Sequence, residues 1–257
     1  MKQMKFFLAA VMAVVMGMSV TSCMKDSESA YDIGVYASVV DDITSVTLLG
    51  DDGNTYYPVN PSALKANGET SYPQRVFVYL KYAEGVTAES TKKDVTIVQY
   101  ASLYTRSLCL RPDTIKADLP LAGLTDFGVV NAATATMFNN VPAYCNVVFT
   151  IYIDNAAAVV DLVPVTAAGN ELTVKLQQTV GNKDAVYQTQ GYASFSIPSV
   201  SEINAALALA QETAGGEEAS EAPTLVPEGG KIKIKVIGTG KTQNYELSSK
   251  EVKISNY

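Results

Sequence analysis

Short runs of alternating apolar residues, separated by turn-forming residues, recur along most of the 257-residue chain. Between residues 33 and 40, every second position is apolar: Ile33, Val35, Ala37 and Val39. Side chains at this spacing share one face of a β-strand. The alternation returns at 76–82 and 94–110, and β-rich runs continue at 127–130, 143–153, 158–165, 171–179, 191–197 and 231–237. The pattern predicts an all-β protein built of antiparallel sheets or barrels.

A tight hairpin turn is predicted at residues 51–54, where Asp-Asp-Gly-Asn separates two β-rich runs. Gly and Asn tolerate the positive φ that such turns need, and Tyr56 and Tyr57 begin the return strand. The two acids invite a metal site, but the twelve-residue calcium-loop pattern is absent. We therefore expect a structural turn and no metal.

The length of the chain without residues 1–22, which are predicted below to be a removed signal, favours two domains, with a single large β domain as the alternative. Five strands with one short helical turn over residues 31–111 fit an OB-like five-stranded barrel. Pattern alone requires only a small antiparallel β domain there. Residues 112–126 contain Pro and Gly and are the predicted linker. Residues 127–257 are predicted to form an antiparallel β-sandwich.

One inserted stretch near 199–230 departs from the strand pattern. Ser199 and Glu202 have capping-box spacing, and the apolar residues that follow recur at helical spacing. We expect an amphipathic helix docked on the sandwich, then a mobile acidic loop at 215–230 with four Glu and two Pro. Residues 231–235 alternate Lys with Ile, which favours a protected edge strand over a basic binding patch.

The N-terminus has the layout of a secretory signal that ends in a lipobox. Lys2 and Lys5 precede an apolar segment at 6–18, and small residues lead to Cys23. The apolar segment is shorter than the roughly 20 residues of a spanning helix. Removal of residues 1–22 and lipid attachment at Cys23 are favoured over an ordinary secreted protein. Residues 23–30 would then be a flexible leash to the membrane.

Localisation to the outer membrane follows from position 24, which is Met and not the Asp that retains many lipoproteins at the inner membrane. The charged residues at 25–28 loosely resemble the surface-export signal of Bacteroidetes lipoproteins. Display on the cell surface is therefore favoured over the periplasmic face. Asp-Thr-Ile at 113–115 also matches a short O-glycosylation sequon of these bacteria, with Thr114 as the candidate site.

The composition disfavours an enzyme. The chain has no His, no nucleophile elbow, no Walker loop and no dinucleotide fingerprint. No cofactor is expected, and the abundant acids nominate no carboxylate pair for glycoside hydrolysis. Without residues 1–22 the chain holds 17 basic and 26 acidic residues, a formal charge of −9, so nucleic acid is not an expected partner.

Two cysteines and two tyrosines remain as candidate site residues. Cys109 and Cys145 lie in apolar, strand-like runs. Buried free thiols are favoured there over a disulfide or a reactive nucleophile. Among the 15 tyrosines, Tyr56 and Tyr57 beside the predicted turn are candidate binding aromatics. Tyr is also common in strands for structural reasons, which is the alternative.

Several short motifs together resemble the NigD-like lipoproteins of Bacteroidetes. They lie at residues 48–55, 57–58, 74–76, 144–149, 175–178, 183–184 and 191–195. The resemblance implies an N-terminal OB-like domain, a C-terminal sandwich and an association with bacteriocin immunity. This chain departs from the family pattern in three places. Cys145 stands where the family has an aliphatic residue, and Gln178 stands where the family often has His. Residues 199–230 look like an insertion in this chain.

We therefore predict a non-enzymatic outer-membrane lipoprotein that presents binding loops to a protein partner. Bacteriocin immunity is one version of this role. The alternative is a surface glycan-binding accessory lipoprotein.

Overall fold

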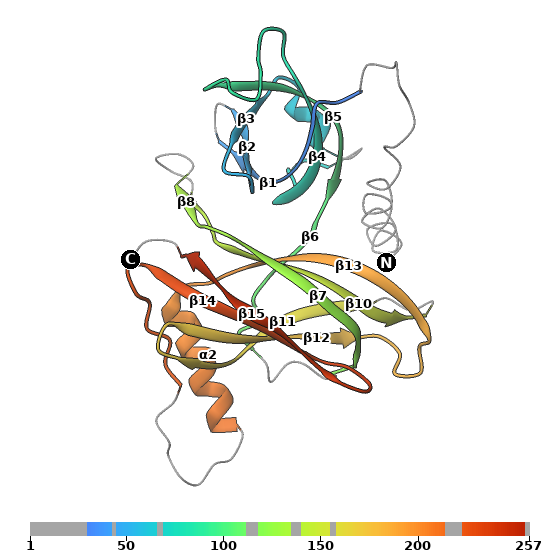
Figure 1. The fold of residues 1–257 in the computed structure, drawn as a ribbon, viewed down its shortest axis with the longest axis vertical. Coiled ribbons are helices and arrows are strands. Elements are labelled where there is room, and N and C mark those ends of the chain that lie inside the picture. The colour runs from blue at the N-terminus through green and yellow to red at the C-terminus, as the bar shows by residue number, and fades with distance from the viewer. Residues whose placement is uncertain are drawn as a thin grey trace. The chain divides into compact units, whose positions relative to one another are not determined.

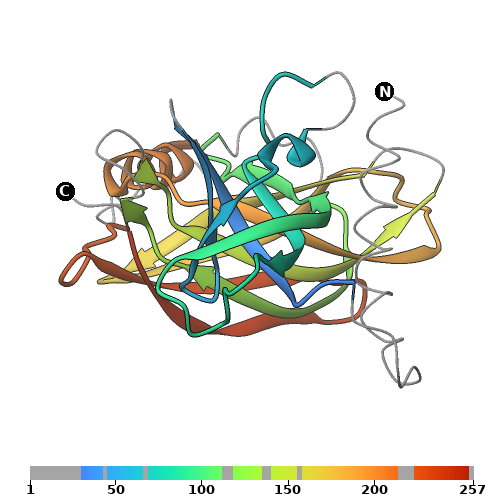
Figure 2. The ribbon, with the colours of Figure 1, turned by 90° about the horizontal axis from the view of Figure 1, so that it is seen from above.

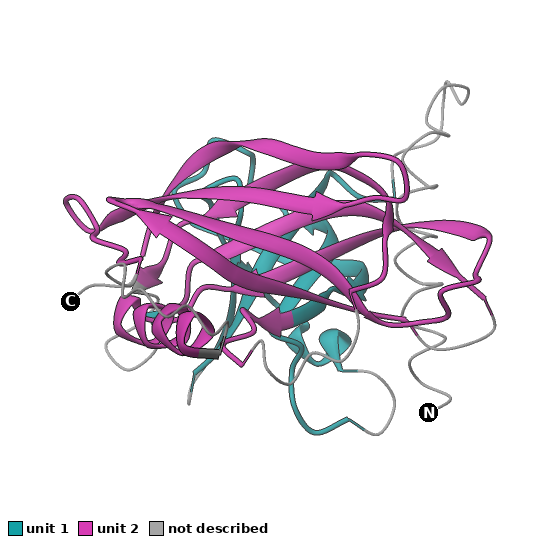
Figure 3. Cartoon of the chain, turned by 90° about the horizontal axis from the view of Figure 1, so that it is seen from below, with its two compact units in different colours: residues 1–105, 134–141 teal, residues 106–133, 142–257 magenta. Residues whose placement is uncertain are grey.

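The computed structural model describes residues 30–42, 45–65, 69–111, 118–134, 140–154, 158–213 and 223–254. The predicted signal, Cys23, Thr114 and most of the predicted acidic loop lie outside these ranges. The chain divides into two compact units (Figure 3). Unit 1 comprises residues 1–105 and 134–141, and unit 2 comprises residues 106–133 and 142–257.

Unit 1 is built around a closed barrel of five strands in the order β1-β2-β3-β5-β4 (Figure 1). The strands are β1 (Ile33–Asp41), β2 (Val46–Gly50), β3 (Thr55–Pro58), β4 (Arg75–Tyr82) and β5 (Lys93–Ser102). Only β3 and β5 pair in parallel, and the 3-10 helix η1 (Pro61–Leu64) follows β3. The predicted OB-like five-stranded barrel is confirmed.

The barrel interior collects one face of each strand, as the alternation predicts. Its core contains Val35, Leu48, Tyr56, Val78 and Ile97, all buried. Alternate positions on β1 and β4 therefore point outward, among them Tyr36 and Tyr79. Burial of the apolar set, at roughly 25 cal/mol per Å² of apolar surface, holds the barrel closed.

Unit 2 contains two four-stranded sheets, confirming the predicted sandwich (Figure 2). One has the order β6-β13-β10-β7, from β6 (Tyr104–Ser107), β7 (Leu121–Val130), β10 (Tyr144–Ile153) and β13 (Tyr187–Ser196). The other has the order β11-β12-β14-β15, from β11 (Val159–Ala168), β12 (Glu171–Val180), β14 (Lys231–Thr239) and β15 (Asn244–Lys253). A separate ribbon pairs β8 (Ala133–Thr134) with β9 (Asn140–Val141), and its residues 134–141 are assigned to unit 1.

The helix α2 (Val200–Thr213) begins with the predicted capping box. The backbone N–H of Ser199 donates to Glu202 Oε2 at 3.0 Å, and the N–H of Glu202 donates to Ser199 Oγ at 3.4 Å. Ile203 and Leu207 are buried, and the helix packs against β11. The amphipathic helix docked on the sandwich is thus confirmed. None of the helices in the described ranges is long and apolar enough to span a membrane.

The predicted edge strand at 231–235 is wrong. The β14 strand lies inside its sheet, parallel to β12 on one side and antiparallel to β15 on the other. The helical crossover through α2 returns the chain beside β12, which makes the parallel pairing feasible. The lysines of β14 are offset by acids on β15, with Lys231 Nζ 2.7 Å from Glu251 and Lys235 Nζ 2.6 Å from Glu246.

Two strand boundaries also differ from those predicted from the sequence. The strand predicted at 94–110 is divided, since β5 ends at Ser102 and β6 joins a sheet of unit 2. The β7 strand begins at Leu121, inside the segment expected to be a linker. Both stretches mix apolar and polar residues, so composition alone does not mark where pairing starts.

Candidate binding surfaces

The turn between β2 and β3 is fixed to β4 by a partly buried ion pair. The guanidinium of Arg75 is fully buried and donates to both carboxylate oxygens of Asp51, each at 2.6 Å. Its Nη1 also donates to Ser38 Oγ at 3.0 Å. A bidentate pair of this kind sets the orientation of both partners. Asp51 is thus a structural residue of the turn.

The second acid of the turn is held by neutral donors. Asp52 accepts the hydroxyl of Tyr56 at 2.6 Å and both the backbone and side-chain N–H of Asn54 at 3.0 Å. Burial alone would raise the pKa of Asp52, but these hydrogen bonds outweigh it and hold the pKa below its usual value. Burial and the adjacent carboxylate raise the pKa of Tyr56. Within the described part of the chain no group of three or more His, Cys, Asp or Glu could hold a metal ion.

The two predicted binding aromatics have different surroundings. Tyr56 is fully buried in the barrel core, whereas Tyr57 is exposed on the outer face of β3. Of this pair, only Tyr57 presents ring surface to a ligand. The ammonium of Lys92 lies over that ring, 5.4 Å from its centroid, and also pairs with Asp94 at 2.8 Å.

Tyr57 belongs to an exposed apolar surface, the β3–β5 patch, formed with Val59 and Val98. The backbone N–H of Val59 continues the pairing with β5 by donating to Val95 at 2.9 Å. The side chain of Asn60 then takes the place of a strand residue, with hydrogen bonds to both backbone groups of Ile97 at 2.8 and 3.0 Å. This pairing brings the exposed side chains of both segments to one outer face.

A row of aromatic rings in tilted and edge-to-face contact follows the outward-pointing positions of β1 and β4, with Phe77 buried and the three tyrosines partly exposed. Its members are Tyr31, Tyr79, Phe77 and Tyr36, with successive centroids 4.2, 5.1 and 4.8 Å apart. Gly34 lies opposite Tyr79, and a Cβ there would approach the Phe77 ring to 3.0 Å. We call this set the aromatic row. The sequence analysis missed it, although the alternation of Gly34 and Tyr36 with core positions was the available signal.

Three exposed apolar side chains of unit 2 lie at or beside the connection between β12 and β13, at one end of the sandwich. Val180, Val186 and Tyr187 are 46 %, 71 % and 72 % exposed. Val180 and Tyr187 continue the faces of β12 and β13 that are buried farther along each strand. They are therefore core-type positions that lack a cover at the end of the sheets. We call these three residues the sandwich-end patch.

Gln178 lies one inward-facing position deeper on β12 and is buried. Its Nε2 donates to the carbonyl of Tyr152 at 2.9 Å, and its Oε1 has no hydrogen-bond partner among the described residues. A Cβ at Gly181 would lie only 2.3 Å from that Nε2, so the amide packs directly beneath the connection that follows β12. Gln178 thus leaves an unused acceptor beneath the patch.

The connection at 181–186 is ordered by its own hydrogen bonds. Asn182 donates to Asp154 at 2.7 Å and accepts the backbone N–H of Asp184 at 3.0 Å. Nearby, the ammonium of Lys241 lies 3.8 Å from the centroid of the Tyr152 ring. The sandwich-end patch is thus bordered by polar side chains and by charged side chains of both signs.

The two cysteines of the folded region are free thiols. Cys145 is buried in β10, and burial raises its pKa to about 12. Cys109 is partly exposed, and its thiol contacts the carbonyl of Arg111 at 3.7 Å. A thiol with a raised pKa is a poor nucleophile at neutral pH, so Cys145 serves the core.

No protein-family profile and no curated protein matches this chain. Solved structures do. A candidate lipoprotein from Bacteroides fragilis is 11 % identical, with a TM-score of 0.48 over 87 % of this chain and 98 % of that one. A Bacteroides vulgatus protein of unknown function (DUF1344) is 14 % identical, with a TM-score of 0.47 over 84 % and 89 %. A NigD-like immunity protein from Bacteroides caccae is 15 % identical, with a TM-score of 0.44 over 86 % and 94 %. The solved structures similar to this chain thus include a NigD-like protein, the family that the motifs indicated.

Proposed function

We propose that this chain is a non-enzymatic lipoprotein, anchored in the outer membrane through Cys23, that binds a protein partner through the sandwich-end patch. One observation carries the binding role. Val186 and Tyr187 leave about seven-tenths of their surface in water, although Tyr187 continues the inward-facing row of β13. Exposed apolar patches with a polar border are typical of contact sites between proteins.

The patch has the chemistry of an interface centre. Tyr is enriched among the residues that dominate binding energy, because its ring is large and its hydroxyl tolerates water. Full burial of a side chain the size of Val or Leu is worth about 1.5–3 kcal/mol. The hydrogen bonds of Asn182 order the connection in advance, which lowers the entropy lost on binding.

Gln178 adds a polar element beneath the patch. Its unpartnered Oε1 would accept a donor from water or from a group that a partner inserts. The border includes Lys183, Asp184 and Lys241, so charges of both signs surround the apolar centre. A mixed border of this kind suits a protein surface better than a strongly charged polymer.

Bacteriocin immunity is one version of this proposal, with the toxin or its cellular target as the partner. A toxin gene encoded beside this one would support that version. The alternative, a glycan-binding accessory role, draws on the exposed ring of Tyr57. Loss of glycan retention in Tyr57→Ala, with no effect of changes at the sandwich-end patch, would favour the alternative.

The binding role is tested with matched surface variants of the mature chain. The double variant Val186→Asp/Tyr187→Ser removes two exposed apolar side chains, and Val59→Asp/Val98→Ser does the same on the β3–β5 patch as the control. A protein recovered from intact cells and then purified should bind the wild type and the control equally and should lose at least tenfold in affinity for the sandwich-end variant. Equal binding to all three would contradict the proposal.

A further inference from the structure

We infer that the aromatic row, at the end formed by Tyr31 and Tyr79, rests on the lipid headgroups of the membrane that holds the anchor. The inference rests on lipid attachment at Cys23 and adds a second, non-covalent contact between unit 1 and the bilayer. It concerns a surface distinct from the sandwich-end patch.

The length of the tether limits where unit 1 can stand. Tyr31 is the eighth residue after Cys23. A fully extended chain spans at most about 3.6 Å per residue, so Tyr31 stays within about 29 Å of the lipidated residue. The chain is fixed to the barrel directly afterwards, because Asp32 donates its N–H to Leu80 and accepts that of Tyr82. Among the described residues of unit 1, those around Tyr31 are therefore joined to the anchor by the shortest length of chain.

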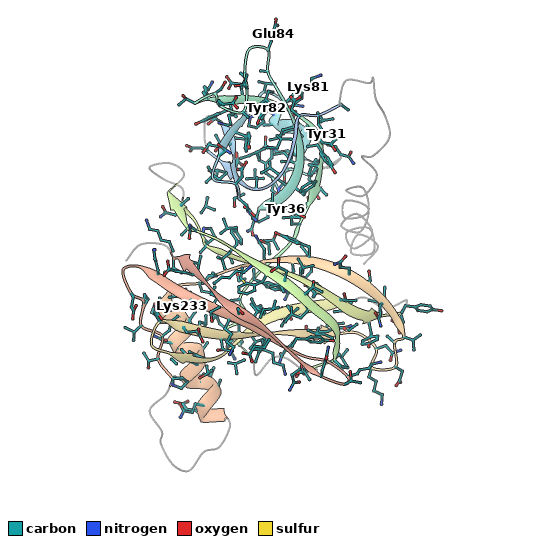
Figure 4. The ribbon with its side chains drawn as sticks, viewed as in Figure 1. Tyr31, Tyr36, Lys81, Tyr82, Glu84 and Lys233 are labelled. Atoms are coloured by element: carbon teal, nitrogen blue, oxygen red, sulfur yellow. The ribbon has the colours of Figure 1, made fainter. Side chains whose placement is uncertain are left out.

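The side chains at this point suit a membrane interface. The rings of Tyr31 and Tyr79 lie 4.2 Å apart and are both partly exposed. Lys81 is the next outward-facing residue of β4 and is exposed. Figure 4 shows Tyr31, Lys81 and Tyr82 gathered on one part of the barrel. Tyrosine rings favour the headgroup level, with the apolar ring toward the acyl chains and the hydroxyl in water. A lysine stem extends the apolar contact while its ammonium reaches the phosphates.

The charge of the protein makes a broad electrostatic attraction unsuitable. The mature chain carries a formal charge of −9, which disfavours close approach to an anionic leaflet in general. The Tyr31 end of the row presents uncharged rings beside Lys81 and the exposed carboxylate of Asp32, while Glu84 lies on the loop that follows β4 (Figure 4). Two tyrosines alone bind bilayers weakly. A tether supplies an effective concentration of lipid in the millimolar range, so a weak contact becomes populated.

Tryptophan reporters test the contact, because the chain contains no Trp. The mature chain with Cys109→Ser would be coupled through Cys23 to a maleimide lipid in vesicles of phosphatidylethanolamine and phosphatidylglycerol. Tyr31→Trp reports the row, and Tyr79→Trp is the second reporter if the first variant does not fold. Tyr57→Trp is the control in the same unit, on the outer face of β3. Flotation of the vesicles verifies coupling in each case.

We expect blue-shifted emission from the Tyr31→Trp reporter and at least threefold stronger quenching by brominated lipids than at position 57. Equal quenching at both positions, or no quenching of the coupled Tyr31→Trp protein, would overturn the inference. A blue shift that appears only when a purified protein partner is added would also overturn it. None of these results bears on whether Cys23 is lipidated in cells, which fatty-acid labelling tests separately.

Discussion

Replacing Asp51 by Ala should destabilise unit 1 far more than an exposed ion pair of the same residue types would suggest. Arg75 is fully buried, Asp51 accepts two hydrogen bonds from it at 2.6 Å, and Ser38 accepts another at 3.0 Å. Breaking a buried pair costs about 3–5 kcal/mol, because the remaining charge has lost its partner. The side chain of Asp51 is 20 % exposed, so water offsets part of the loss. We expect about 3 kcal/mol.

Asp94→Ala is the matched control. Asp94 pairs with Lys92, but the two side chains are 35 % and 67 % exposed. Such surface pairs contribute less than about 1 kcal/mol. The double variant Asp51→Ala/Arg75→Met should be less destabilised than Asp51→Ala alone, since it leaves no buried charge.

Amide hydrogen exchange of β1 and β4 is the suitable assay, because a chain of two units need not unfold in one transition. A loss of about 3 kcal/mol corresponds to roughly 150-fold faster exchange of the best-protected amides. Asp94→Ala should change these rates less than about fivefold. Equal effects of Asp51→Ala and Asp94→Ala would contradict a structural role of the Asp51–Arg75 pair, and so would a double variant as unstable as Asp51→Ala.

Three further outcomes are expected. Tyr56→Phe should raise the pKa of Asp52 and lower the free energy of unfolding by about 1.5–3 kcal/mol at pH 7. Because the pKa of Asp52 is depressed in the native protein, this difference in stability from the wild type should persist above about pH 4. It should vanish as the pH falls through the native pKa of Asp52. Urea titrations from pH 7 to pH 2 would show this, and a pH-independent difference would argue against it. Iodoacetamide at pH 8 should label Cys109 much faster than Cys145 in the native protein, and it should label both in denaturant. Peptide mass spectrometry measures the labelling at each cysteine. Equal labelling rates in the native protein would contradict the burial of Cys145. Incorporation of a fatty-acid analogue in cells should disappear in Cys23→Ala, and persistent labelling would remove the basis for the anchor.

Local sequence patterns were sufficient where local physics decides the structure. The strict alternation at 33–40 specified which face of β1 is buried, and the observed core contains Val35 and Ala37. The pair Ser199 and Glu202 specified the start of α2, since a capping box is complete within one helical turn. Turn chemistry at Asp51 to Asn54 likewise specified the hairpin of β2 and β3.

Features that depend on distant pairing were missed or misread. The lysines of β14 looked like those of an edge strand, and only the crossover through α2 places β12 beside them. The aromatic row requires the register of β1 with β4, which joins Tyr36 to Phe77 across 41 residues of chain. The exposure of Tyr187 depends on where both sheets of the sandwich end, and its own strand pattern predicts an inward-facing residue.

A photo-crosslinking amino acid at position 187 in intact cells tests whether the sandwich-end patch contacts a protein partner. The same amino acid at position 57 is the control, because both side chains are exposed and they lie in different units. We expect one discrete protein adduct from position 187 that position 57 does not give. No adduct at position 187, or the same adduct from both positions, would contradict a partner-binding role for the sandwich-end patch.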